Sequence, residues 1–104
     1  MKKKMPDWLI LCVWRGLLGE IYSNIRAIAI SLSPDHTLLI RYYLDRESTD
    51  VDMENMEVVA TNISAMTGRD MINHIDIECQ FSIAPIGKID SLDGFIYCRK
   101  EAWD

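Results

Sequence analysis

The sequence has few of the residues and motifs that enzymes and cofactor-binding proteins commonly use. It contains two histidines, His36 and His74, which lie far apart in the chain of 104 residues. The motifs GxSxG, GxGxxG and GxxxxGK[ST] are absent, which excludes the nucleophile elbow and the common phosphate-binding loops. We therefore expect a protein that is not an enzyme and that binds no cofactor.

Cysteine is also scarce. Cys12, Cys79 and Cys98 are odd in number and widely spaced, so the sequence indicates neither a disulfide framework nor a CxxC zinc site. Each cysteine lies in an apolar pattern. We expect buried free thiols in a reducing cytoplasm.

No apolar run is long enough to span a membrane. Residues 2–4 are lysines and residues 8–14 are apolar, which resembles the start of a secretory signal, but Arg15 interrupts the run. A membrane-spanning helix needs about 20 apolar residues. We therefore expect a cytoplasmic protein without membrane contact.

Basic residues are outnumbered. There are 16 acidic residues against 11 basic ones, and the net charge of −5 argues against direct nucleic-acid binding, which needs cationic groups. The acidity is local, because residues 45–57 hold six acids and the single base Arg46. Two interpretations stay open: favourable electrostatics at the start of a helix, or a docking surface for a basic protein.

Hydrophobic periodicity predicts six elements in one α+β domain over residues 1–104. They are a helix over 6–19, strands over 24–32 and 37–44, a helix capped by Ser48 or Thr49 and ended by Gly68, and strands over 74–83 and 95–100. The order is α-β-β-α-β-β. We expect two helices packed on one face of a four-stranded, mainly antiparallel sheet.

The alternation along residues 74–83 is strict, as is typical of an antiparallel sheet covered on one face. The apolar side consists of Ile75, Ile77, Cys79, Phe81 and Ile83. In the first strand, Arg26 is expected to share a face with Ile28, and Ile86 and Ile89 can pack beneath the loop over residues 85–94. The uncovered sheet face is expected to present these residues to solvent: Arg41, Tyr43, His74, Asp76, Glu78 and Gln80.

The first helix is apolar around most of its circumference. A broad apolar face is expected to consist of Trp8, Leu11, Cys12, Trp14, Leu18 and Ile21, and it is widened further by Leu9, Ile10, Val13 and Leu17. Such a helix either packs on two sides or is partly covered by a partner. A subunit whose first helix is covered by another protein or by a second copy is therefore one interpretation.

The alternative function uses the exposed sheet face. His74, Asp76 and Glu78 alternate along one strand, so their side chains point together and could hold a metal ion or a small molecule. The same spacing is typical of any solvated strand face. We assign no metal ligands and keep a small-molecule or metal-binding domain as the alternative.

The candidate partner-binding residues lie on and before the second helix. The acidic ones are Asp45, Glu47, Asp50, Asp52 and Glu54. Tyr43 and Arg41 precede them on the outward side of the second strand, and both residue types are enriched at the centres of protein interfaces.

Several segments resemble one family of small bacterial proteins. They are LLGEI at residues 17–21, NIRA at 24–27, the hairpin end YYLD at 42–45 and the acidic start of the second helix, within residues 15–65. They resemble the immunity proteins of contact-dependent growth inhibition and related polymorphic toxin systems. The resemblance implies stoichiometric binding and neutralisation of a cognate toxin domain, without catalytic residues.

Toxin domains in such systems are often nucleases, which are basic because they bind nucleic acid, so an acidic inhibitor is physically consistent. The resemblance thus implies a basic toxin, commonly a nuclease, as partner. We expect a monomer or a weak dimer in its absence.

Overall fold

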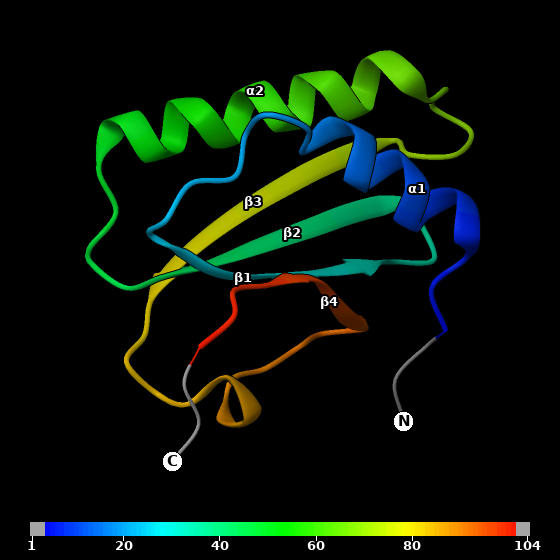
Figure 1. The fold of residues 1–104 in the computed structure, drawn as a ribbon. Helices are drawn as coiled ribbons and strands as arrows, with labels where there is room; N and C mark the ends of the chain where they lie inside the picture. The colour runs from blue at the N-terminus through cyan, green and yellow to red at the C-terminus, as the bar shows by residue number, and fades with distance from the viewer. Residues whose placement is uncertain (1–3, 102–104) are drawn as a thin grey trace.

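The computed structural model describes residues 4–101, in which two helices cover one face of a four-stranded sheet (Figure 1). The elements are α1 (Asp7–Gly16), β1 (Ile25–Leu32), β2 (Thr37–Leu44), α2 (Asp50–Met66), β3 (His74–Phe81), the 3-10 helix η1 (Ile86–Lys88) and β4 (Gly94–Cys98). The predicted α+β class and element order are confirmed.

The strand order is β3-β2-β1-β4. β1 pairs antiparallel with β2 and with β4, whereas β2 and β3 are parallel. The sheet is therefore mainly antiparallel but mixed. β3 runs parallel because α2 forms the crossover that returns the chain to the starting end of β2. The expectation that β3 is antiparallel to its neighbour was wrong. The alternation of polar and apolar residues indicates that one face of a strand is buried, but it does not indicate the direction of the strand.

The sequence predicted some helix ends more accurately than others. α1 ends at Gly16, and Gly19, with φ 78°, lies in the turn that follows. α2 begins at the predicted cap, because the Thr49 side chain accepts from the Asp52 amide and the Asp52 carboxylate accepts from the Thr49 amide. It ends at Met66, before Gly68.

Two strands are shorter than predicted. β3 stops at Phe81, and Ile83 beyond it is 87% exposed, so its expected place on the buried face was wrong. β4 starts at Gly94 and stops at Cys98.

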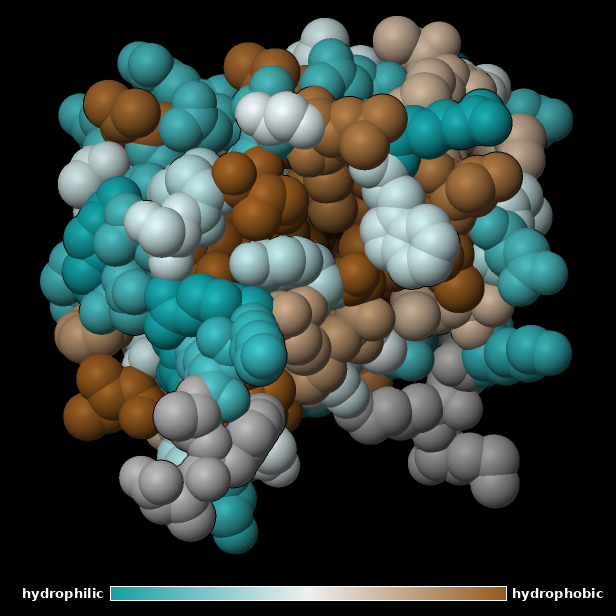
Figure 2. Space-filling model, viewed as in Figure 1, coloured by the Kyte–Doolittle hydropathy of each residue, from teal (hydrophilic) through white to brown (hydrophobic). Residues whose placement is uncertain are grey.

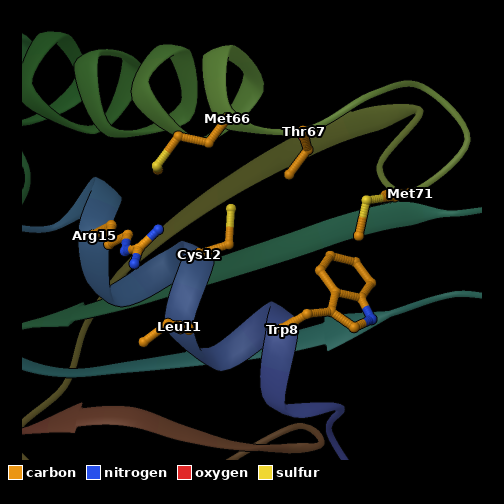
Figure 3. Close-up of a pocket in the computed structure, with 7 residues that line it drawn as sticks. All are labelled: Trp8, Leu11, Cys12, Arg15, Met66, Thr67 and Met71. Carbon is orange, nitrogen blue, oxygen red and sulfur yellow. The ribbon is translucent and has the colours of Figure 1, made fainter.

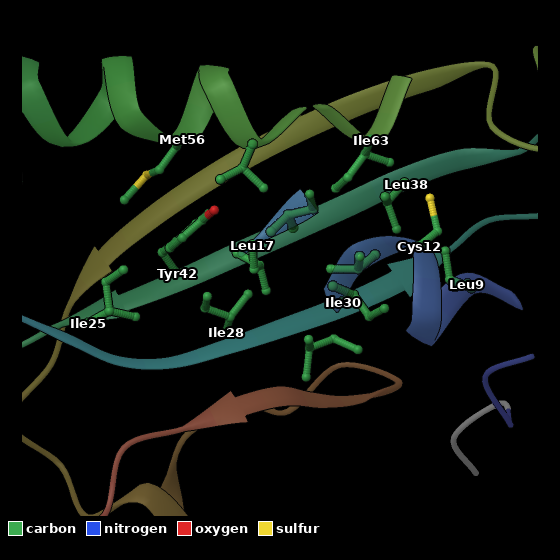
Figure 4. Packing of buried hydrophobic residues seen from close by; sticks show 14 of the residues in the cluster. Leu9, Cys12, Leu17, Ile25, Ile28, Ile30, Leu38, Tyr42, Met56 and Ile63 are labelled. Carbon is green, nitrogen blue, oxygen red and sulfur yellow. The ribbon is translucent and has the colours of Figure 1, made fainter. Parts of the chain in front are cut away.

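The main core lies between the sheet and the two helices (Figure 4). α1 contributes Leu9, Cys12 and Val13, and Leu17 follows the helix. α2 and the central strands supply the rest, including Met56, Val59, Ile63, Ile25, Ile28, Ile30, Leu38, Ile40, Tyr42 and Leu44. Each large aliphatic side chain buried in this way contributes about 1.5–3 kcal/mol.

The opposite sheet face is open along β3, where His74, Asp76, Glu78 and Gln80 are exposed as predicted, but it is covered over the central strands. Tyr43 is 2% exposed and belongs to a second cluster with Ala27 and Ala29. Ile89, Leu92 and Phe95 pack against this cluster from the segment that links β3 to β4 and from β4 itself. The prediction that Tyr43 faces solvent was wrong, because this connecting segment covers the central strands.

A bulge in β1 changes which face of the sheet its side chains point to. The pairing register shifts between Ile25 and Ala27, so Ile25 joins Ile28 in the main core. Arg26 bonds instead to Glu101 and to the carbonyl of Ser82. The expectation that Arg26 shares a face with Ile28 was therefore wrong, because the inserted residue reverses the alternation.

Candidate functional site

The acidic segment contains two kinds of carboxylate. Asp52 is 1% exposed and accepts hydrogen bonds from Tyr22, from Arg46 Nη1 at 2.6 Å and from the Thr49 amide at 2.8 Å. The bond from Arg46 holds the pKa of this carboxyl well below its usual range, against the raising effect of burial. Asp52 therefore holds the start of α2 in place and offers no surface to a partner.

Asp45 is also engaged, although it lies at the surface. It accepts from Arg99 Nη1 at 2.7 Å and from Asn24 Nδ2 at 2.9 Å, and the bond from Arg99 lowers its pKa. Arg99 in turn pairs with Glu101. Asp45 thus links the end of β2 to the chain that follows β4.

The remaining predicted acids are exposed. Glu47, Asp50 and Glu54 line the start of α2 and make no ion pair with a residue in the described range 4–101. We call these three residues the acidic corner. They are the members of the predicted acidic set that remain available to a partner.

Arg41 and Tyr43 are not available as interface anchors. The Arg41 side chain is 17% exposed and pairs with Glu78 at 2.7 Å and with Asp90 at 3.5 Å. The Tyr43 hydroxyl donates to the carbonyl of Asp90 at 2.6 Å. Both side chains therefore fasten the connecting segment to the sheet.

The predicted three-donor set on β3 does not come together. His74 Nε2 lies 2.8 Å from Asp76 Oδ1, but Glu78 pairs with Arg41. Within residues 4–101, no three His, Cys, Asp or Glu side chains are grouped as metal ligands would be. Among the cysteines only Cys12 is buried, while Cys79 is half-buried and Cys98 is exposed.

The broad apolar surface predicted for the first helix is divided between the core and the outside of the molecule. Leu9, Cys12, Val13 and Leu17 face inward. The outer residues of α1 and of the turn after it remain exposed: Leu11 50%, Trp14 52%, Leu18 75% and Ile21 39%. We call these four residues the α1 ridge. The unusual breadth of the apolar pattern was the feature of the sequence that pointed to it.

Figure 2, viewed as in Figure 1, shows hydrophobic side chains gathered around a hollow in the middle of the molecule, with hydrophilic side chains toward both the left and the right edges. Two hollows share Trp14. One, of about 370 Å³, lies between the ridge and Ile96 and Tyr97 of β4. The other, of about 310 Å³, is bordered by Asp7, Ile10 and Leu11. The ridge therefore stands between concave apolar surfaces.

A third hollow of about 220 Å³ lies between α1 and the C-terminal end of α2 (Figure 3). Its lining residues are Trp8, Leu11, Cys12, Arg15, Met66, Thr67 and Met71. Burial raises the pKa of the Cys12 thiol, as is usual for a buried structural cysteine. This hollow offers apolar contact rather than chemistry.

Within residues 4–101, no helix has the length and apolar character needed to cross a membrane. The described surface exposes carboxylates at the start of α2 and apolar side chains on α1. Protein-binding domains expose both kinds of residue at their interfaces.

The chain belongs to the family described as MafI2 immunity protein, which its residues 6–101 match. The match spans every helix and strand of the described structure. No curated protein matches the chain. The resemblance to immunity proteins of polymorphic toxin systems is thereby confirmed, and family membership supports an immunity function with a toxin as partner.

Proposed function

We propose that this protein neutralises a cognate toxin domain by binding it stoichiometrically, without catalysis of its own. The family match over residues 6–101 carries the proposal. The partner that fits best is a basic domain, and a nuclease is the class of toxin that must be basic to bind its substrate. The net charge of −5 complements such a partner, and the encounter takes place in the cytoplasm, where nucleic acid is exposed.

The acidic corner would steer the encounter. Glu47, Asp50 and Glu54 are exposed and are not neutralised by a neighbouring cation in the described structure. Exposed charges of this kind raise the association rate and disfavour partners of like charge, more than they raise affinity. Asp45 and Asp52, which are already bonded to arginines, would instead hold the surface in shape.

Co-expression with the toxin domain encoded by the adjacent reading frame tests the proposal. We expect survival of the cells and a one-to-one complex in size-exclusion chromatography. Growth arrest together with the absence of any complex would contradict the proposal.

A pair of charge reversals tests the acidic corner. Glu47→Lys/Asp50→Lys should lower the association rate and weaken its dependence on salt. The control Asp70→Lys/Asp76→Lys changes the net charge equally at exposed aspartates away from the start of α2. Equal effects of the two double variants would show that only net charge matters and would remove the acidic corner from the contact surface.

A further inference from the structure

We infer that the α1 ridge forms the apolar centre of the interface with a basic protein partner, which is the toxin domain if the proposed function holds. The inference rests on that proposed function and goes beyond it by assigning the contact surface and its anchor, Trp14.

The exposure of the ridge is the first observation. Singly exposed apolar residues are normal on protein surfaces, but a contiguous group marks an interaction site. Leu11, Trp14, Leu18 and Ile21 come from one helix and the turn that follows it, and their exposed fractions run from 39% to 75%. The hollows beside Trp14 can receive apolar side chains of a partner.

The fixed position of Trp14 is the second observation. Its indole Nε1 donates to the carbonyl of Ile96 at 3.0 Å, while 52% of the residue stays exposed. This bond restricts the ring before any partner arrives, so less side-chain entropy is lost on binding. Tryptophan is also among the residue types enriched at energetic hot spots.

The position of the ridge relative to the acidic corner indicates which kind of partner covers the ridge. The chain runs from the ridge directly to Tyr22, whose hydroxyl donates to Asp52 in the first turn of α2. Figure 1 shows this connection running from α1 toward the start of α2. The end of the ridge is therefore tied through Tyr22 to the first turn of α2, which carries Asp50 of the acidic corner, and an apolar centre with a polar rim is the usual arrangement of protein interfaces.

Charge then decides between a second copy and a foreign partner. A symmetric dimer through the ridge would bring two chains of net charge −5 together with their acidic corners near the contact. A basic partner would instead gain attraction at the rim while it covers the ridge. The ridge is therefore assigned to a basic protein.

Leu18→Ser is the main test, because Leu18 is 75% exposed and forms no part of the core. Binding of the variant to the purified toxin domain, measured by surface plasmon resonance, should weaken about tenfold or more, mainly through faster dissociation that salt leaves unchanged. The matched control is Ile83→Ser, at an aliphatic residue that is 87% exposed away from the ridge, and its affinity should change less than about twofold. Trp14→Phe removes the bond to Ile96 and should also weaken binding, with thermal unfolding as the check on folding.

The outcomes separate the inference from the proposed function. If Leu18→Ser and Leu11→Ser bind the toxin domain as tightly as the wild type does, the inference is overturned and the immunity function stands. Absence of a wild-type complex would overturn both. Light scattering that shows a wild-type dimer dissociated by Leu18→Ser would assign the ridge to a second copy and overturn the choice of partner.

Discussion

Arg26 and Glu101, 75 residues apart, form a two-bond ion pair in which Nε and Nη2 of the guanidinium donate to the two carboxylate oxygens at 2.9 and 2.8 Å. Arg26 is 6% exposed, and its third bond goes to the carbonyl of Ser82 at 2.8 Å. A buried cation needs a partner, so the bulge in β1 and the segment after β4 depend on each other.

Glu101→Gln should therefore lower the free energy of unfolding by about 2 kcal/mol at pH 7, because it leaves the Arg26 charge buried without a counter-ion. Urea unfolding followed by circular dichroism measures the change. Glu78→Gln is the control, because its partner Arg41 keeps a second carboxylate, Asp90, 3.5 Å away. A loss no larger than that of the control would show that the pair contributes little.

The same pair predicts a pH dependence of stability. Hydrogen bonding from Arg26 lowers the pKa of Glu101 from 4.5 to about 2 in the folded protein. Since the folded pKa lies below the unfolded one, the contribution is complete above the unfolded pKa of 4.5 and is lost as the pH falls toward 2. Urea midpoints measured across this range should fall more steeply for the wild type than for Glu101→Gln. Parallel curves would contradict the prediction.

Asp52→Asn should destabilise the protein by about 2 kcal/mol, because it weakens the helix cap and removes the charge that faces Arg46. Asp50→Asn is the matched control at an exposed residue of the same helix turn, and its effect should stay within about 0.5 kcal/mol. Chemical unfolding of the two variants measures the difference. Equal losses would mean that first-turn charge, rather than burial and bonding of Asp52, stabilises α2.

Tyr43→Phe should cost about 1 kcal/mol, because the hydroxyl no longer donates to the carbonyl of Asp90. Amide exchange over residues 85–93 should become faster, since this bond fastens the segment to β2. Tyr97→Phe is the control, at a half-buried tyrosine whose hydroxyl bonds to no described residue. Unchanged exchange in Tyr43→Phe would show that apolar packing alone holds the segment.

Gly16→Ala should destabilise the protein, although alanine is the better helix former. A Cβ at position 16 would lie 2.7 Å from Cγ1 of Ile63, a residue with no exposed surface. Overpacking of this kind costs about 1–3 kcal/mol, which exceeds the propensity gain of about 1 kcal/mol. Gly87→Ala meets no atom within 4 Å and is the control. A thermal midpoint raised in Gly16→Ala would show that α1 and α2 can separate at little cost.

Periodicity and local capping chemistry account for the parts of the fold that the sequence predicted. Alternation located β2 and the start of β3, and Thr49 with Asp52 marked the start of α2, because these features depend on residues close together in the chain. The local excess of acidic residues could likewise be found by counting charges along the sequence.

The candidate site was predicted only in part. Glu47, Asp50 and Glu54 are exposed as expected, but Asp52 and Tyr43 are buried. A count of charges cannot tell which of the carboxylates pair with Arg46 and Arg99. The sequence indicated that a partner could cover the first helix, but it did not identify the α1 ridge as the exposed side, because an all-round apolar helix does not indicate which side the sheet will cover.

The sequence by itself therefore determined the secondary-structure elements, their order, the α+β class and the excess of negative charge, since each follows from local pattern and composition. Only the tertiary structure decided that β3 runs parallel to β2, that a connecting segment covers Tyr43, that a bulge turns Arg26 toward Glu101, and that Trp14 stays exposed. These features depend on contacts between residues far apart in the chain, and a local pattern of polar and apolar residues carries no information about which distant element covers a given face.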